Sequence, residues 1–390
     1  MNPGQKGQRI LALVLAGLAL WAGRYLGTQA AGWFLALAAG YALNRSRVCF
    51  VAGFRDPFIS GSSVMARALL AGLFLATLLY FPFQYQAYQA GTVLPGNVLP
   101  VGLNTLAGGL LHGAGMVLAG GCITGVLTRT GDGMVTQLVS LMGAVTGATV
   151  AAYHWDRWAS YGWRLAPVHL PSLLGWPLAL LSQLAALAGL MLYLYRRQLR
   201  QYAEVRASAP GKVRRVARQH ALVDRWLARP WPSIAGTLAL ALVSAAYLYT
   251  YGLPLGASSA FPRWGARLWA LVGGQPASWP YFAGGSQLVT SLWLDPRSIS
   301  NAGLVAGSAM ASLLAGTLRL RVPKSHRQVG VALAGGVILG YGARLAPGCN
   351  LGAFFIAIPS MSLHGWVWAL GALGGTWLGV HALVRALGDS

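Results

Sequence analysis

Hydrophobic residues in this chain come in long uninterrupted runs rather than in the alternating patterns of amphipathic helices or strands. Four stretches contain no aspartate, glutamate, lysine or arginine: residues 68–128, 165–195, 230–262 and 345–384. A helix needs about 20 apolar residues to cross the hydrocarbon core of a bilayer. Each stretch is therefore long enough for at least one membrane-spanning helix.

Seven runs are predicted to be complete spans: Ile10–Leu26, Ala66–Pro82, Met134–Tyr153, Leu173–Tyr195, Ser233–Tyr249, Asn301–Leu318 and Leu363–Ala382. No small-residue cleavage site follows the first run, so we interpret it as a retained span rather than a signal peptide. Three other runs are shorter and end in glycine-rich or arginine-rich breaks: Gly32–Leu43, Leu103–Gly120 and Gly330–Leu345. We expect these to be discontinuous or re-entrant helices, because irregular backbone at membrane depth must line a cavity or be buried in protein.

The composition agrees with a membrane protein. Of 390 residues, 56% are hydrophobic and 9% are charged, and the mean hydropathy is +0.55. Soluble domains carry about 25% charged residues. This excludes an ordinary soluble enzyme, a disordered chain and a coiled coil. A net charge of +22 would suggest nucleic acid in a soluble protein. Here we expect no nucleic-acid partner, because too little hydrophilic surface is present to bind one.

The one clearly hydrophilic stretch is residues 196–230, with ten basic and two acidic residues. The positive-inside rule places this stretch in the cytoplasm, and a second basic connection at 319–327 on the same side. We expect the stretch to contact anionic membrane lipid, with docking of a partner as the alternative. It divides the chain into a first membrane repeat, 1–195, and a second membrane repeat, 231–390.

The two halves share an ungapped block of glycines, leucine, alanine and cysteine. It runs from Gly108 to Gly125 in the first half and from Gly335 to Gly352 in the second, with matching positions 227 residues apart. The match predicts an internal duplication. Inverted repeats build many secondary transporters, whose sites lie near the bilayer midplane at broken helices. The predicted fold is therefore an all-α polytopic membrane protein of two repeat-related halves, inverted, with discontinuous or re-entrant half-helices.

All three cysteines, Cys49, Cys122 and Cys349, fall at predicted breaks rather than inside spans. Their odd number in a long chain excludes a disulfide framework, and the absence of a C-x-x-C pair argues against a metal site. A turn leading into a helix N-terminus exposes backbone N–H groups, which bind anions and favour thiolate over thiol. A membrane cysteine is ordinarily a small packing residue. Because all three cysteines lie at predicted breaks, we favour a functional role for them over a packing role.

All but three of the 29 basic residues are arginines. Charges at membrane depth are costly and usually face a cavity or a partner. Only seven acids are present; we expect Asp56 to pair Arg55 and Asp132 to pair Arg129. Together these arginines predict an electropositive path for an anion, although snorkelling of each to lipid head groups stays open. Those near the breaks are Arg45, Arg47, Arg55, Arg129, Arg263, Arg267 and Arg344.

Other chemistry finds little support. The sequence has no carboxylate pair for hydrolysis, no Ser-His-Asp arrangement and no phosphate-binding loop. We interpret His112 and His364 as packing or hydrogen-bonded residues. We therefore expect no enzyme activity, no cofactor and no metal, and transport that is driven by a gradient or is channel-like.

The cysteine-bearing motifs resemble those of the YeeE/YedE family of thiosulfate-type sulfur permeases in the bacterial inner membrane. They are Arg47-Val-Cys49-Phe-x-x-Gly-Phe-Arg55-Asp, Ala119-Gly-Gly121-Cys122-x-x-Gly with Arg129-x-Gly-Asp-Gly, and Gly348-Cys349-Asn350-x-Gly. Details around Arg263 and Arg344 look closer to the YedE branch, which is associated with selenium metabolism. The order of the two halves is instead that of the thiosulfate permeases.

The resemblance implies that the thiols hand an anion along through S–H hydrogen bonds. Cys49 would lie on the side where the anion enters, Cys122 at the centre and Cys349 beyond. Weak serial sites let an ion leave as well as arrive. The residues that would attract the anion or support the motifs are Arg47, Arg55, Arg129, Arg263, Arg344, Asn350, Gly121 and Gly348.

Three functions stay open on the sequence. The first is an inner-membrane permease that imports thiosulfate or another small sulfur or selenium anion. The second is a membrane sulfurtransferase or redox subunit that passes persulfide to a cytosolic acceptor protein. The third is a passive channel for a small solute.

Overall fold

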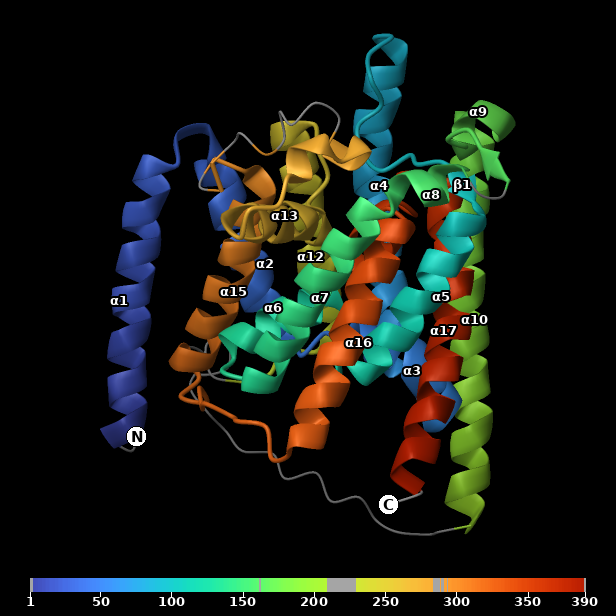
Figure 1. The fold of residues 1–390 in the computed structure, drawn as a ribbon. Coiled ribbons are helices and arrows are strands. Elements are labelled where there is room, and N and C mark those ends of the chain that lie inside the picture. Colours follow the sequence, from blue (N-terminus) through green and yellow to red (C-terminus); the bar gives the residue numbers. More distant parts are fainter. Residues whose placement is uncertain are drawn as a thin grey trace.

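The computed structural model describes residues 3–160, 163–208, 229–282, 288, 291–292 and 294–388. Over these residues the chain is almost entirely helical, and the only named strands are a two-residue antiparallel pair, β1 (Val101–Gly102) and β2 (Arg164–Leu165). Seven of the described helices are long and apolar enough to cross a membrane. The prediction of an all-α polytopic membrane protein is confirmed (Figure 1).

The α-helices before the basic stretch are α1 (Pro3–Tyr25), α2 (Ala30–Ser46), α3 (Phe50–Ile59), α4 (Val64–Gln89), α5 (Leu103–Leu118), α6 (Ile123–Gly131), α7 (Val135–Tyr153), α8 (Trp155–Ser160), α9 (Leu170–Leu174) and α10 (Trp176–Ser208). Those after it are α12 (Ser233–Tyr251), α13 (Phe261–Leu271), α15 (Pro296–Leu314), α16 (His326–Leu345) and α17 (Leu363–Gly388). A π-helix, η5 (Asn350–Ile356), lies between α16 and α17, and short 3-10 turns are η1 (Gly27–Gln29), η2 (Ser258–Ala260), η3 (Pro276–Ser278) and η4 (Pro280–Phe282).

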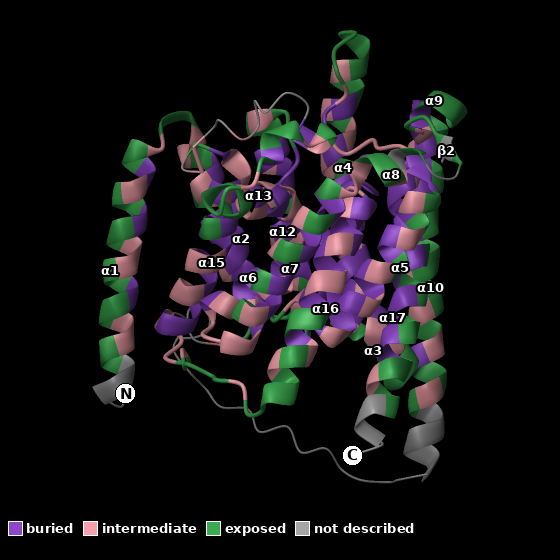
Figure 2. Ribbon diagram, viewed as in Figure 1, coloured by how far each residue is buried: buried purple, intermediate pink, exposed green. Residues whose placement is uncertain are grey.

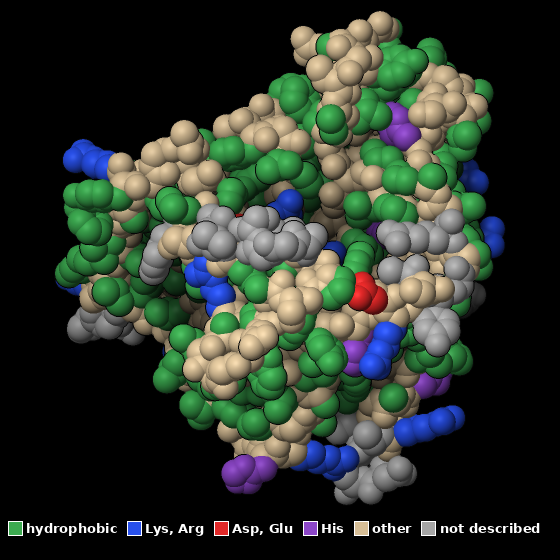
Figure 3. Space-filling model, turned by 45° about the horizontal axis from the view of Figure 1, so that its top comes forward, with side chains coloured by type: hydrophobic (Ala, Val, Ile, Leu, Met, Phe, Trp, Pro, Cys, Tyr) green, Lys and Arg blue, Asp and Glu red, His purple; other side chains and the backbone are tan. Residues whose placement is uncertain are grey.

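Buried residues gather in the middle of the bundle, and the outer helices carry exposed apolar side chains (Figure 2). The span Leu103–Gly131, which holds α5 and α6, has 67% of its most apolar window buried, whereas Trp176–Tyr202 in α10 has 17%. Helix α10 therefore offers its apolar side chains to lipid, and α5 belongs to the core. Hydrophobic side chains also cover much of the face seen in Figure 3.

The two ends of the bundle can be told apart in Figure 1. Helix α1 begins and α17 ends at one end, together with the connection from α15 to α16. The C-terminal part of α4 projects from the opposite end. We call the first of these the termini end.

Glycines bring α5 and α16 into backbone contact at their crossing. A Cβ on Gly108 would lie 2.8 Å from the carbonyl oxygen of Gly342, and one on Gly115 would lie 3.0 Å from that of Gly335. In the duplication Gly108 matches Gly335, and Gly115 matches Gly342. Each contact therefore joins a glycine of one matched pair to a glycine of the other pair. Reciprocal contacts of this kind are typical of two-fold related elements. They agree with the predicted inverted duplication, which stays a prediction.

Several predicted boundaries were wrong. Gly330–Leu345 ends at Leu345, before the predicted break, but its helix, α16, begins earlier, at His326, and has 20 residues. Helix α4 runs through Pro82 to Gln89. Helices α1 and α15 form as predicted but are not among the seven helices that are both long and apolar enough to cross a membrane. Of the basic stretch 196–230, the first residues extend α10 to Ser208, and residues 209–228 lie outside the described part of the chain.

Candidate substrate pathway

Each cysteine lies at the start of a short helix, as its sequence position suggested. Cys49, Cys122 and Cys349 are the N-cap residues of α3, α6 and η5, which have 10, 9 and 7 residues. A rise of about 1.5 Å per residue makes an α-helix of this length too short to cross a bilayer. The three thiols therefore lie at interruptions in the helical bundle.

The break before α6 depends on small residues. Gly120 has a φ of +69°, a left-handed conformation that glycine adopts without a steric penalty. A Cβ on Gly121 would lie 2.7 Å from the Gln137 side-chain oxygen. The turn brings the backbone N–H of Gly125 to 3.3 Å from the Cys122 sulfur. This buried thiol thus caps its own helix.

The break before η5 is tighter. A Cβ on Gly348 would lie 2.8 Å from the backbone nitrogen of Ala353, so only glycine fits there without a shift. The buried amide of Asn350 lies 2.9 Å from Nε2 of His112, whose Nδ1 lies 3.0 Å from the Leu339 carbonyl oxygen. His112 therefore fixes the residue next to Cys349 by hydrogen bonds.

His364 also holds this break in place. It is completely buried, and its Nε2 lies 3.1 Å from the carbonyl oxygen of Ala346, three residues before Cys349. Its Nδ1 lies 2.9 Å from the carbonyl oxygen of Pro100. Both histidines are therefore hydrogen-bonded residues of the core, as predicted.

Arg129 connects two of the cysteine-bearing breaks. Its Nη2 donates to the Cys49 sulfur over 3.3 Å, and its Nη1 donates to the carbonyl oxygen of Gly120 beside the Cys122 break. Cys122 and Cys349 belong to one buried hydrophobic cluster, and Cys49 packs against it. Thiols that are distant in sequence therefore lie in one region of the core, with a guanidinium group beside it.

The expected pairing of Arg129 with Asp132 is wrong. Asp132 instead accepts from Arg321 over 3.1 Å, and its other oxygen accepts from the hydroxyl of Ser312. The two partners of the ion pair are separated by 189 residues of sequence. Only the folded chain brings the basic connection after α15 against α6.

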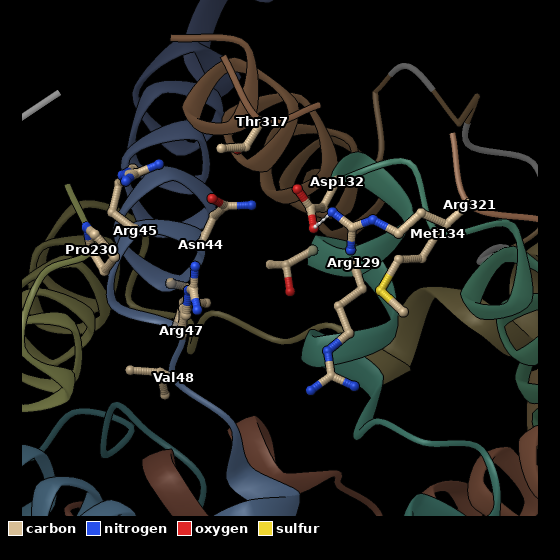
Figure 4. Close-up of a pocket in the computed structure, with 12 residues that line it drawn as sticks. Asn44, Arg45, Arg47, Val48, Arg129, Asp132, Met134, Pro230, Thr317 and Arg321 are labelled. Atoms are coloured by element: carbon tan, nitrogen blue, oxygen red, sulfur yellow. Dashed lines mark hydrogen bonds and ion pairs between the residues drawn. The ribbon is translucent and has the colours of Figure 1, made fainter. Parts of the chain in front are cut away.

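A cavity of about 540 Å³ opens beside these residues, and we call it the arginine pocket. Four arginines and one acid line it, so its charge is strongly positive. Figure 4 shows Asn44, on α2, and Arg47, which follows this helix, at one side, and Arg129 and Asp132 at the other. The lining residues are Leu43, Asn44, Arg45, Arg47, Val48, Thr128, Arg129, Asp132, Met134, Pro230, Thr317 and Arg321.

The remaining predicted arginines do not line this pocket. Arg55 pairs with Asp56 at 2.8 Å, as predicted. Arg263 pairs with the buried carboxylate of Asp295 at 3.0 Å.

Arg344 has aromatic partners instead of a carboxylate among the described residues. It donates to the Tyr281 hydroxyl over 2.7 Å and lies over the rings of Tyr281 and Trp155. The charges of Arg263 and Arg344 both act on Arg297, which the sequence analysis did not select. These three arginines thus form a second basic region, away from the arginine pocket.

Sequence reasoning selected Arg47 and Arg129 but gave Arg321 only a topological role. Arg45, two residues before Arg47, was likewise among the arginines near the predicted breaks. Nothing in the sequence connects Arg321 with α2 or α6, because its place in the pocket depends on how the connection after α15 folds back.

Comparison with known proteins decides the family. The sequence model described as sulphur transport matches residues 45–378. The chain belongs to the sulphur transport family. All three cysteines lie within the matched region.

Individual relatives agree with this assignment. The chain is 37% identical over 160 residues to the probable transporter YedE of Escherichia coli, but the match covers only 40% of this chain and 39% of that protein. Thiosulfate transporter TsuA of Spirochaeta thermophila is 25% identical over 361 residues, covering 91% of this chain and 98% of TsuA. Thiosulfate transporter TsuA of Escherichia coli is 26% identical over 342 residues, and the match covers 87% of this chain and 90% of that protein.

Proposed function

We propose that this protein is a permease of the bacterial inner membrane that imports thiosulfate or a close sulfur or selenium analogue. The observation that carries the proposal is the position of all three cysteines at the starts of short helices, with Arg129 donating to one of them. Family membership and the full-length match to two thiosulfate transporters support it. The partial match to YedE keeps selenium compounds in the proposed substrate class.

The chemistry of the thiols suits such a substrate. The terminal sulfur of thiosulfate is soft and polarizable, and a thiol is a weak donor with a polarizable sulfur of its own. Exchange between such weak sites lets the anion move on rather than stay bound. In this proposal Cys122 takes the central place, because it shares a buried cluster with Cys349 and its break is joined to Cys49 by Arg129.

Charge supports an order of the thiols along the proposed path. The arginine pocket is lined by Pro230 and Arg321, which belong to the two basic connections assigned to the cytoplasm. Arg129 joins this pocket to Cys49. We therefore place Cys49 at the cytoplasmic end of the path, as the last thiol that an imported anion meets. This reverses the place that the family resemblance implied for Cys49.

Uptake of radiolabelled thiosulfate by proteoliposomes tests the proposal. Wild-type protein should accumulate label, and Cys122→Ala and Cys349→Ala should each reduce the initial rate at least about tenfold, the cost of a transition-state interaction of roughly 1.4 kcal/mol. Lys324→Gln, on an exposed connection outside the pocket, is the matched control and should transport normally. Undiminished uptake by both cysteine variants would contradict the thiol pathway.

The same experiment separates the two alternatives. A persulfide detected by mass spectrometry on a cysteine, without net uptake, would indicate a sulfurtransferase. Equal flux of thiosulfate, sulfate and uncharged solutes would indicate a passive channel.

A further inference from the structure

The arginine pocket has no role in a relay between thiols alone, because Cys49 is not among its lining residues. The pocket nevertheless carries more positive than negative charge, because four arginines and only one aspartate line it. Arg321 is paired with Asp132, but the side chain of Arg47 makes no hydrogen bond or ion pair with any residue that the structure describes. A cluster of like charges that repel one another is costly to assemble. The cost points to an anionic ligand.

The pocket offers guanidinium groups from separate elements. Arg45 and Arg47 come from the end of α2, Arg129 from α6 and Arg321 from the connection after α15. Guanidinium forks match the spacing of two oxygens on one oxyanion. Figure 4 shows open space between Arg47 and Arg129, where such an anion would lie between the two sides.

We propose that the arginine pocket is a binding site for small dianionic oxyanions, on the cytoplasmic side of Cys49. An anion in this site takes N–H groups of Arg47 and Arg129, so it competes with the Cys49 sulfur for Arg129. The pocket selects by charge and thereby differs from the thiols, which select for soft sulfur. The direction of passage rests on the proposed function, but the existence of the site does not.

The dimensions indicate weak binding. A volume of about 540 Å³ leaves room for water around a small oxyanion, and the side chain of Arg321 is 46% exposed. Hydrated, exposed charges interact weakly and are screened by salt. Such a site can receive an anion from the path and release it to the cytosol.

Alkylation of Cys49 measures occupancy of the site without requiring transport. The full chain carrying Cys122→Ala and Cys349→Ala keeps a single cysteine, and N-ethylmaleimide labelling is followed by intact mass. Sulfate, which does not react with the reagent, is the probe anion. Sulfate should slow labelling of Cys49, because an anion held by Arg129 lies beside the sulfur to which the same guanidinium group donates and obstructs the reagent. Chloride at equal ionic strength should not slow it.

The variants decide the outcome. Arg47→Gln should raise the sulfate concentration for half-protection about tenfold, the usual value of one charge-assisted hydrogen bond. Lys324→Gln should leave it unchanged. If Arg47→Gln does not fold, Arg321→Gln replaces it, with the same expected direction. Protection by chloride equal to that by sulfate, or half-protection unaltered in a folded pocket variant, would overturn the proposal.

Thiosulfate uptake by the wild-type protein separates this inference from the proposed function. Charge-dependent protection without uptake of thiosulfate would leave the oxyanion site intact and remove the proposed substrate. Cysteine-dependent uptake without such protection would support the proposed substrate and remove the oxyanion site.

Discussion

Arg47 is one of two non-glycine residues in the described chain that have a positive φ, with φ 51° and ψ 34°. Its backbone N–H ends α2 by bonding to the carbonyl oxygens of Asn44 and Leu43. Glycine is the usual residue at such a position, since a left-handed conformation costs other residues about 1 kcal/mol or more. We interpret the strain as the cost of holding a guanidinium group at the arginine pocket.

Replacing Arg47 should therefore separate stability from function. Arg47→Gly should be about 1 kcal/mol more stable than Arg47→Ala, because only glycine relieves the left-handed backbone. Both variants lose the charge, so both should transport thiosulfate more slowly than Arg47→Lys. Thermal unfolding followed by tryptophan fluorescence, together with uptake rates, checks this. Equal unfolding temperatures for the glycine and alanine variants would show that the backbone is not strained.

His169 predicts a pH dependence of stability. Burial lowers the pKa of His169 from 6.5 to about 4, and its Nε2 has no hydrogen-bond partner among the described residues. Between these pH values the unfolded chain binds a proton that the folded chain does not. Stability should therefore fall as the pH drops from 6.5 to 4, by up to about 3 kcal/mol.

The unfolding temperature at pH 7, 5.5 and 4.5 measures this effect. His169→Gln should lose less stability over the same range than the wild type, because glutamine does not titrate. Parallel losses in the two proteins would assign the pH dependence to other groups.

At the level of elements, His112 joins three parts of the path. It lies on α5, faces the Leu339 carbonyl oxygen on α16 and holds Asn350 at the start of η5. Leu339 lies 227 positions after His112, the offset of the predicted duplication. The two helices thus cross at equivalent positions, and the histidine connects this crossing to the Cys349 break.

His112→Ala should be strongly destabilising. It leaves a cavity and a buried polar partner without a hydrogen bond, which together cost about 2–4 kcal/mol. Thiosulfate uptake should fall as well, because Asn350 no longer fixes the turn beside Cys349. His381→Ala on the exposed side of α17 is the control and should change stability by less than about 0.5 kcal/mol. Similar unfolding temperatures for the two variants would contradict the role of His112.

For the whole molecule, charge and shape together predict an orientation. The C-terminal end of α10, which leads into the first basic connection, and the connection after α15 lie at the termini end, whereas the exposed Val93 follows α4, which projects from the opposite end. The positive-inside rule then places the arginine pocket in contact with the cytoplasm.

Labelling of introduced cysteines measures this orientation. In a variant whose three native cysteines are alanines, Val93→Cys should react with a membrane-impermeant maleimide added to intact cells. Lys324→Cys should react only after the membrane is opened. Labelling of Lys324→Cys in intact cells would reverse the orientation, and with it the order of the thiols.

The helices were largely predictable because a bilayer imposes a length and a composition on every segment that crosses it. The errors arose where local pattern and packing disagree. Gly348 lies in the break that was expected after Gly330–Leu345, whereas the glycines within α16 let this helix approach its neighbours closely. A sequence pattern cannot distinguish these two uses of glycine, because both follow from the missing Cβ.

The sequence by itself determined that this chain is a multi-pass membrane protein, that its cysteines lie at helix breaks and that it belongs among sulfur transporters. These properties depend on local composition and short motifs. Only the tertiary structure decided that Arg129 faces Cys49, 80 residues away, and that Asp132 pairs with Arg321 rather than Arg129. Ion pairs form where the fold brings charges together, and that distance is set by the packing of helices rather than by separation along the chain.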